Sequence, residues 1–316
     1  MSRPAVNRSH VNRSQVDRST VDRSVAGGDA ADRSPPNRSG LDRFTVPWLR
    51  PVTAILLSAI FFIPLYLACV NVIKPTDKIS QSPASLPIPP TLHNITAVLT
   101  RPDRLFWASL TNSVEVTALS VLVLTVLSAM LGHYLARSRS RWTRALTLVL
   151  LCGLMIPPQV ILIPVAKVLQ VAHLMTTVQG LILFNVGYYV PFGVFVFAGF
   201  IRSVPVELEE AAAIDGASRM QVFWQIVFPL LRPATASVLI FLGVWIWNDF
   251  IDPLIILGPG SGTTVTTGVY RAIGQYQVDF GSVFAMMFLA TLPVLVFYLL
   301  LQKQFVKGLT GGATKG

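Results

Sequence analysis

The residue types that perform chemistry are few and scattered in this sequence. Asp249 and Asp252 form a D-x-x-D pair, in which two carboxylates can bind a divalent metal, but no further acidic cluster accompanies them. The four histidines, at positions 10, 93, 133 and 173, are far apart, and no Ser/His/Asp set is evident. The phosphate-binding pattern G-x-x-x-x-G-K-[ST] is not found. We therefore expect no catalytic centre, metal or cofactor on this chain.

The composition predicts an integral membrane protein. Of the 316 residues, 53% are hydrophobic and only 13% are charged, which is typical of a polytopic membrane protein. A bilayer core about 30 Å thick needs about 20 apolar residues per helical crossing, and the apolar runs here lack the alternation of barrel strands. We predict an all-α bundle of six transmembrane helices, at about residues 52–73, 113–136, 145–169, 178–201, 226–250 and 282–302.

The distribution of basic residues predicts the orientation of these spans. Nine of the 25 basic residues precede Pro51, and others follow the second and sixth spans: Arg137, Arg139, Arg141, Arg144, Lys303, Lys307 and Lys315. With six spans these segments all lie on one side, which the positive-inside rule makes cytoplasmic. We expect both termini in the cytoplasm, the loop from Lys74 to Asn112 outside, and no role for nucleic acid in the net charge of +10.

Residues 1–50 form a region separate from the membrane domain of residues 51–316. From Val6 they follow a five-residue period, VNRSH, VNRSQ, VDRST, VDRSV, with arginine at the centre of each repeat. Because a solenoid would need an apolar residue there, we expect a disordered cytoplasmic tail. The tail is either simply solvated or in electrostatic contact with anionic membrane lipid.

A polar, alanine-rich stretch, EEAAAIDGASRMQVFWQIVFPLLRP, lies between the fourth and fifth spans. The acids at positions 207, 209 and 210 favour a helix amino terminus there, with Pro205 in its first turn. Asp215-Gly216 predicts a turn, and Ser218 can cap a second helix. We expect a helix-turn-helix over about residues 203–225, on the cytoplasmic side.

The side chains of this hairpin predict two surfaces. The alanines at positions 211, 212, 213 and 217 allow another protein to approach closely, whereas Phe223, Trp224 and Ile226 are expected to tie the second helix to the bundle. Pro229 and Pro233 are expected to kink the entry to span five. An ordinary cytoplasmic loop is the alternative interpretation.

Ten positions in and directly after this hairpin resemble the cytoplasmic signature of permease subunits of binding-protein-dependent ATP-binding-cassette (ABC) importers. They are Glu210, Ala211, Ala212, Asp215, Gly216, Ala217, Phe223, Ile226, Pro229 and Pro233. Further segments, such as NSVEVTALSVLVLTVLSAMLGHYLARSR, IPPQVILIP and WNDFIDPLIIL, are similar to the MalG-like permeases of the carbohydrate-uptake branch. The resemblance covers Pro51 to Gly316, although the family usually has glutamate where Asp249 stands.

The resemblance implies a half-channel in the cytoplasmic membrane of a bacterium. A second, MalF-like permease would complete a heterodimer, two ATPase subunits holding ATP and Mg would bind beneath it, and an extracytoplasmic solute-binding protein would deliver a sugar or oligosaccharide. The helix from Glu210 to Gly216 would then seat in a cleft of the ATPase. The implied ATPase-coupling residues are Glu210, Ala211, Ala212, Asp215, Gly216, Ala217, Phe223 and Pro229.

Polar and aromatic residues within the fourth and fifth spans are candidates for the substrate pathway: Asn185, Tyr188, Tyr189, Trp245, Trp247, Asn248 and Asp249. Aromatic faces beside amides suit the apolar and hydroxyl faces of a sugar. The alternative is that the tryptophans form an interfacial belt and that Asn185 bonds to a neighbouring helix. Prolines 157, 158, 164 and 191 are expected to kink helices around the same cavity.

Two other functions fit parts of the sequence. A permease of the same architecture could import a polyol or a glycerophosphate, and the spans do not distinguish these solutes from a sugar. An integral-membrane enzyme acting on lipid-linked substrates could use Asp249 and Asp252 as its metal pair. Metal-dependent turnover by the isolated chain would support the enzyme, and co-purification of an ATPase would support the permease.

The orientation can be tested by cysteine labelling. In a chain whose Cys69 and Cys152 are replaced by serine, Ser140→Cys should react with a membrane-impermeant thiol reagent only after permeabilisation, because the basic loop is cytoplasmic. A cysteine at Ser85 should react in intact cells. Labelling at position 140 in intact cells would show that the orientation is inverted.

Overall fold

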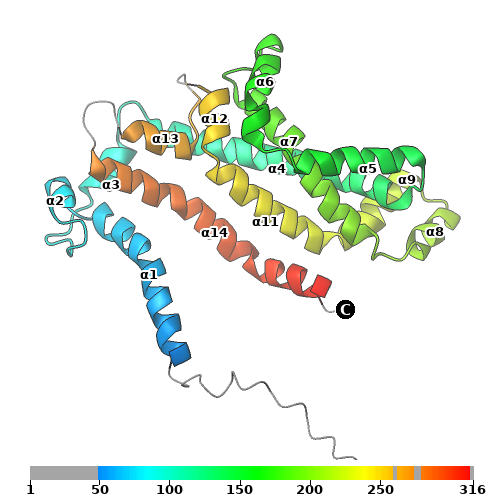
Figure 1. Cartoon of the computed structure of the whole chain (residues 1–316), viewed down its shortest axis with the longest axis horizontal. Coiled ribbons are helices and arrows are strands. Elements are labelled where there is room, and N and C mark those ends of the chain that lie inside the picture. Colours follow the sequence, from blue (N-terminus) through cyan, green and yellow to red (C-terminus); the bar gives the residue numbers. More distant parts are fainter. Residues whose placement is uncertain (1–48, 259–261, 274–278, 314–316) are drawn as a thin grey trace, which may run out of the picture. The chain divides into compact units, whose positions relative to one another are not determined.

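The computed structural model describes residues 49–258, 262–273 and 279–313, and in these ranges all regular secondary structure is helical, with no strand among them (Figure 1). The predicted tail of residues 1–50 lies almost wholly outside them. The helices are α1 (Leu49–Val72), α2 (Thr76–Gln81), α3 (His93–Leu99), α4 (Leu105–Arg137), α5 (Arg141–Leu154), α6 (Pro158–Val171), α7 (Val178–Ile201), α8 (Glu207–Ile214), α9 (Arg219–Val222), η2 (Phe223–Val227), α10 (Phe228–Leu230), α11 (Arg232–Asn248), α12 (Ile251–Ile256), α13 (Val265–Ala272) and α14 (Phe280–Ala313).

Between four and six of these segments are candidate membrane spans in the described ranges. The chain divides into two compact units, Met1–Ser58 and Ala59–Gly316, and the packing below concerns the second. Four helices are long and apolar enough to cross a bilayer by themselves: Pro51–Val72, Leu105–Arg137, Val178–Ile201 and Phe280–Leu300. Two further spans exist only if each of two bent helix pairs is one crossing.

The third predicted span, residues 145–169, is not one straight helix. Its two halves, α5 and α6, meet at an angle of 106°. The break falls at the residues before Pro158, where Pro157 has an extended ψ of 137°. A proline disfavours helical backbone at the residue before it, so two consecutive prolines end one helix and start the next. By contrast, Pro164 and Pro191 lie inside α6 and α7.

The fifth predicted span, residues 226–250, is also interrupted. The helix of residues 219–230 and α11 meet at 73°, with the break at Leu231. Because Pro233 has no N–H to donate, it is tolerated in the first turn of α11, and Arg232 therefore begins a new helix. The apolar run predicted as one crossing thus includes the last two residues of a π-helical turn, Phe223–Val227, and the 17 residues of α11.

Close packing of α4 against α7 forms the centre of the bundle, with α11 beside both (Figure 1). Small residues recur every four positions on the buried face of α4: Ser120, Ser128 and Gly132, with Leu124 between them. A Cβ on Gly193 of α7 would collide with the Ser128 side chain, and one on Gly132 would lie 3.0 Å from the Phe197 Cβ. Since lipid offers no hydrophobic driving force between helices, such small residues promote association by allowing the backbones to approach closely.

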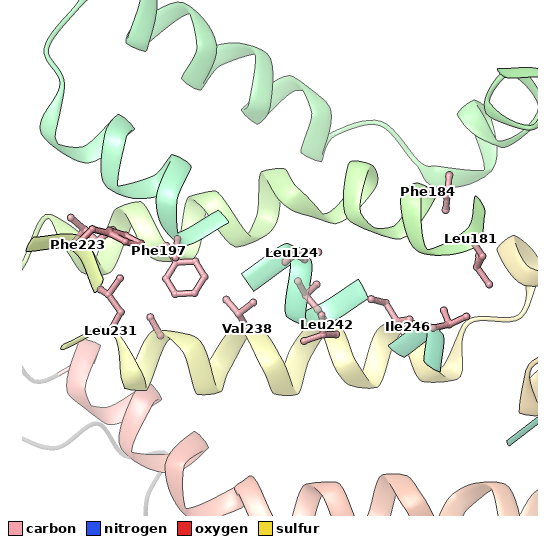
Figure 2. Packing of buried hydrophobic residues seen from close by; sticks show 14 of the residues in the cluster. Leu124, Leu181, Phe184, Phe197, Phe223, Leu231, Val238, Leu242 and Ile246 are labelled. Carbon is pink, nitrogen blue, oxygen red and sulfur yellow. The ribbon is translucent and has the colours of Figure 1, made fainter. Parts of the chain in front are cut away.

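The apolar core follows from this arrangement. Leu124 on α4, Phe197 on α7 and Leu242 on α11 are fully buried in one cluster, which continues to Phe223 and Leu231 at one end and to Leu181 and Ile246 at the other (Figure 2). The same cluster therefore includes Phe223 and Val227 of the π-helical turn in which the hairpin ends. Packing at the end of α7 and the position of the hairpin are consequently linked.

A pair of α7 glycines provides a matched test of the close approach. Gly193→Ala should destabilise the protein by roughly 1–3 kcal/mol, because its methyl group would enter space that Ser128 occupies. Gly187→Ala is the control, since nothing lies within 4 Å of its added Cβ and the gain in helix propensity is the same. Thermal unfolding in detergent measures the difference. Equal melting temperatures for the two variants would contradict the packing described here.

Candidate functional site

The polar stretch between α7 and α11 folds as the predicted helix-turn-helix. The first helix, α8, begins at Glu207, two residues after Pro205, and carries three acids in its first turn. It ends at Ile214, and Gly216 then takes the left-handed conformation, with φ of 88°. The Ala217 N–H donates to the Ala212 carbonyl at 3.0 Å, which closes the helix end. A non-glycine residue at this φ costs roughly 1–2 kcal/mol, so Gly216 makes the tight turn possible.

The second arm of the hairpin is also capped as the sequence predicts. The Ser218 side chain accepts from the Gln221 N–H at 3.4 Å, and the Gln221 side chain accepts from the Ser218 N–H at 2.8 Å. This capping box starts α9, which runs directly into the π-helical turn. The reciprocal bonds set the direction in which the second arm leaves the turn.

One side of the hairpin is packed into the bundle. Phe223 is buried, and Ala212 and Ala217 pack partly buried against the same core. Trp224 is more exposed than predicted, at 38%, although its ring lies 5.0 Å from those of Phe223 and Phe228. The second arm therefore packs into the bundle through Phe223 together with the buried Val222 and Val227.

The opposite side of α8 faces away from the bundle and is bare. Glu210, Ala211 and Ala213 are exposed, and the Ile214 side chain is 87% exposed. Sequence reasoning did not single out Ile214, although it is an apolar residue immediately before a glycine turn. This surface combines an exposed isoleucine and alanines with nearby carboxylates. A partner surface with an apolar pocket and basic residues around it would be complementary to it.

A polar contact that sequence reasoning missed holds the back of α8. Glu209 Oε2 lies 2.9 Å from His133 Nε2, and Glu209 Oε1 lies 2.7 Å from Arg137 Nη2 and accepts from Arg137 Nε at 2.8 Å. Arg137 Nη2 also donates to the Val204 carbonyl at 2.9 Å. His133 and Arg137 are four residues apart on α4, the spacing that puts two side chains on one helix face, and this spacing was the available sequence signal.

The pathway candidates divide into two groups. Tyr188 and Tyr189 on α7 lie with Trp245 on α11 in an aromatic cluster, with ring centroids 4.9 Å apart for the tyrosines and 6.1 Å apart for Tyr189 and Trp245. Phe192 joins it, 5.5 Å from Trp245. Both tyrosines are half-buried and Trp245 is 49% exposed, so the cluster forms part of the surface shared by α7 and α11.

Three of the remaining pathway candidates, Trp247, Asn185 and Asn248, lie apart from this cluster. Trp247 is buried and donates from its indole N–H to the Ala290 carbonyl of α14 at 3.3 Å, so it serves packing. Asn185 is buried and donates to Ser120 of α4 at 3.4 Å, as the alternative interpretation expected. Asn248 is exposed and donates to the Val244 carbonyl within its own helix.

Asp249 and Asp252 lie together at the start of α12, next to Tyr189. Asp252 is buried, and its Oδ1 has no hydrogen-bond partner. Among the described residues no group of three or more His, Cys, Asp or Glu side chains is arranged to hold a metal ion. Burial first, and then the hydrogen bond and charge of Asp249, raise the pKa of Asp252 to about 8, so this carboxyl is mostly protonated near neutral pH.

The profile of one transporter family matches residues 125–311, which include the hairpin and both of its contacts on α4. That family is described as the binding-protein-dependent transport system inner membrane component. The chain belongs to this family. It is therefore a membrane-embedded permease subunit of an ABC importer, whose ATPase lies on separate subunits, and it is not an enzyme itself.

Curated relatives match more than four-fifths of the chain. The melibiose/raffinose/stachyose import permease MelC of Bacillus subtilis is 33% identical over 267 residues, which are 83% of this chain and 95% of the relative. The multiple sugar-binding transport permease MsmG of Streptococcus mutans is 34% identical, covering 81% of this chain and 92% of the relative. A crystal structure of a bacterial ABC transporter that imports alginate has the same fold, with a TM-score of 0.70 and 20% identity, over 85% of this chain and 99% of that one.

The environment of Asp252 predicts a pH dependence of stability. Because its pKa is about 8 in the folded chain and 3.8 ordinarily, folding takes up a proton between these values, and stability should fall as the pH rises from about 4 to about 8. Asp252→Asn should flatten the melting temperature over this range. The exposed Asp77→Asn is the control and should leave the dependence intact. An unchanged profile in Asp252→Asn would show that this carboxyl is not buried as described.

Proposed function

We propose that this permease forms half of the membrane pathway of an importer for a sugar or oligosaccharide. Two observations support the substrate class: the relatives above are named for melibiose, raffinose, stachyose and multiple sugars, and the related fold belongs to an alginate importer. The aromatic cluster of Tyr188, Tyr189 and Trp245 offers flat apolar faces of the kind that contact sugar rings. In this proposal Asp249 contributes hydrogen-bond acceptors beside that cluster.

The proposed complex contains four kinds of chain. A second, MalF-like permease completes the pathway, two ATPase subunits hold ATP and Mg on the cytoplasmic side, and an extracytoplasmic solute-binding protein delivers the substrate. A structure of the alginate transporter with an alginate-bound periplasmic protein supports the last partner, since this chain shares its fold with a TM-score of 0.60. Both termini and the hairpin of residues 203–225 lie on the cytoplasmic side in this proposal, as the basic residues predict.

The hairpin is the proposed ATPase-coupling element, and the observation that carries this role is its two-sided construction. One side is held by Phe223 in the core and by Glu209 on α4, so the hairpin is anchored to the bundle. The other side presents Glu210, Ala211 and Ala213 with the protruding Ile214. A rigid element with a bare, small-residue face can insert into a cleft and transmit movement in either direction. Of the other expected coupling residues, Ala212, Ala217 and Phe223 belong to the anchored side, whereas Asp215 and Gly216 form the turn and Pro229 follows in α10.

Substitutions in the turn and on the bare face test this role. Gly216→Val forces a β-branched residue into a left-handed conformation at a cost of roughly 1–2 kcal/mol or more, and Glu210→Lys reverses a charge on the face and at a helix amino terminus. Both variants should remain inserted and paired with the second permease but should bind the ATPase weakly. Uptake should fall by about tenfold, the factor that 1.4 kcal/mol represents. Co-purified ATPase and substrate-stimulated ATP hydrolysis in reconstituted vesicles are the measurements.

Gly216→Asn is the matched control for the turn. Asparagine tolerates the left-handed conformation better than other non-glycine residues, and nothing lies within 4 Å of a Cβ at this position. This variant should therefore keep most of the ATPase binding. If Gly216→Val and Glu210→Lys both kept normal ATPase binding and stimulated turnover, the hairpin would not be the coupling element.

A further inference from the structure

We infer that α4 is a rigid connection between the coupling hairpin and the segment that begins α13, and that Glu209 attaches the hairpin to α4. This inference rests on the proposed coupling role of the hairpin. It assigns a positioning function to His133, Arg137 and Glu209. We call these three residues the clasp.

The geometry of the clasp ties three segments to one helix turn. Arg137 reaches both Glu209 in α8 and the Val204 carbonyl in the connection after α7. His133 bonds to the second oxygen of Glu209, and its ring lies 5.5 Å from that of Phe223 in the second arm. A single face of α4 therefore contacts the start, the first helix and the second arm of the hairpin.

The side chains of the clasp are shielded from solvent, so their interaction should contribute to the stability of the hairpin's position. The side chains of Glu209, Arg137 and His133 are only 16%, 21% and 23% exposed. Ion pairs at an open surface contribute little, whereas removing one partner from a shielded pair leaves the other without its compensation. Glu210, the next residue, is exposed instead. The two adjacent glutamates thus have different tasks, one toward α4 and one toward the ATPase.

The connections of the hairpin along the chain are less direct than the clasp. Before α8 the backbone passes through non-helical residues around Pro205, and after α9 it passes through a π-helical turn and the 73° bend at Leu231. Neither α7 nor α11 continues into the hairpin as a straight helix. Side chains on α4, more than 60 residues earlier in the sequence, supply the link that avoids these bends.

The other end of α4 is fastened in a similar way. Ser109 donates to the Thr263 hydroxyl at 2.9 Å, Asn112 donates to the Thr263 carbonyl at 2.9 Å, and Ser113 accepts from the Val265 N–H at 2.8 Å. These bonds hold the segment that begins α13. Because α4 is unbroken over 33 residues, about 50 Å at 1.5 Å per residue, it links this segment to the hairpin as one body.

The functional test separates fastening from docking. Arg137→Gln and Glu209→Ala should leave the bare face of α8 able to bind the ATPase, but the solute imported per ATP hydrolysed should fall by about tenfold, equivalent to about 1.4 kcal/mol. Arg137→Lys should restore part of this ratio, because lysine keeps the positive charge but lacks the guanidinium group that contacts both Glu209 and Val204. The double variant should lose no more than the worse single one, because both break one interaction. Arg139→Gln, which removes an exposed charge two residues away, is the control and should leave the solute imported per ATP hydrolysed unchanged.

The possible outcomes distinguish the clasp from the proposed function. If Glu210→Lys loses ATPase binding but the clasp variants keep the wild-type ratio of transport to hydrolysis, the clasp is overturned and the coupling hairpin stands. If Glu210→Lys has no effect on binding or turnover, the coupling role itself is wrong. Clasp variants that lose ATPase binding as completely as Glu210→Lys would also overturn the clasp, since they would show damage to the docking face.

A distance measurement tests the rigid connection directly. Spin labels at Tyr134→Cys on α4 and Leu208→Cys on α8, both exposed positions outside the docking face, should give the same separation in the resting and vanadate-trapped complex, with Cys69 and Cys152 replaced by serine. In the Glu209→Ala background the distribution should broaden. A separation that changes on trapping in the otherwise wild-type complex would show that the hairpin moves independently of α4 and would overturn the inference.

Discussion

The close packing of α4 against α7 positions the other helices of the membrane domain. Inside a bilayer, apolar side chains gain little by leaving lipid for a neighbouring helix, so association must come from close packing and from hydrogen bonds. The recurring small residues of α4 and Gly193 of α7 provide that packing. Because α11 then packs on both helices, the core of Leu124, Phe197 and Leu242 depends on the same contact. The end of α7 carries the hairpin, so its position is also a consequence.

The two helix breaks show how the same apolar composition produces different structures. Prolines 157 and 158 divide one apolar run into α5 and α6, and Pro229 and Pro233 border the bend between α10 and α11. At the second break, Leu231 and Phe223 are buried in the main core, so the bend is packed and serves to turn the chain from the hairpin into the bundle. Hydropathy detects the apolar runs but averages over these breaks, because a sliding window counts side chains and not backbone donors.

Two adjacent glutamates in the first turn of α8 face in different directions. Glu209 is directed to α4 by the helical rotation of about 100° per residue, and Glu210 consequently faces outward. A hairpin exposed on both sides would move relative to the bundle, and a hairpin packed on both sides could not bind a partner. The combination of Phe223 in the core, Glu209 in the clasp and Ile214 in the open makes the hairpin both firm and accessible.

The family and the local structure of the hairpin were predictable from the sequence alone. Asp215-Gly216, Ser218 with Gln221 and the acidic first turn act within a few residues of one another, so their effects can be read without knowing the rest of the fold. The sequence identified the pathway candidates but not their contacts with one another. Tyr188, Tyr189 and Trp245 form one cluster, whereas Trp247 donates to a carbonyl of α14. The helix against which such a residue packs depends on the arrangement of the whole bundle. His133 and Arg137 were visible as a helical pair, but their partner lies more than 70 residues away. That contact arises where α8 packs against α4, and local sequence patterns do not show which distant helices pack together.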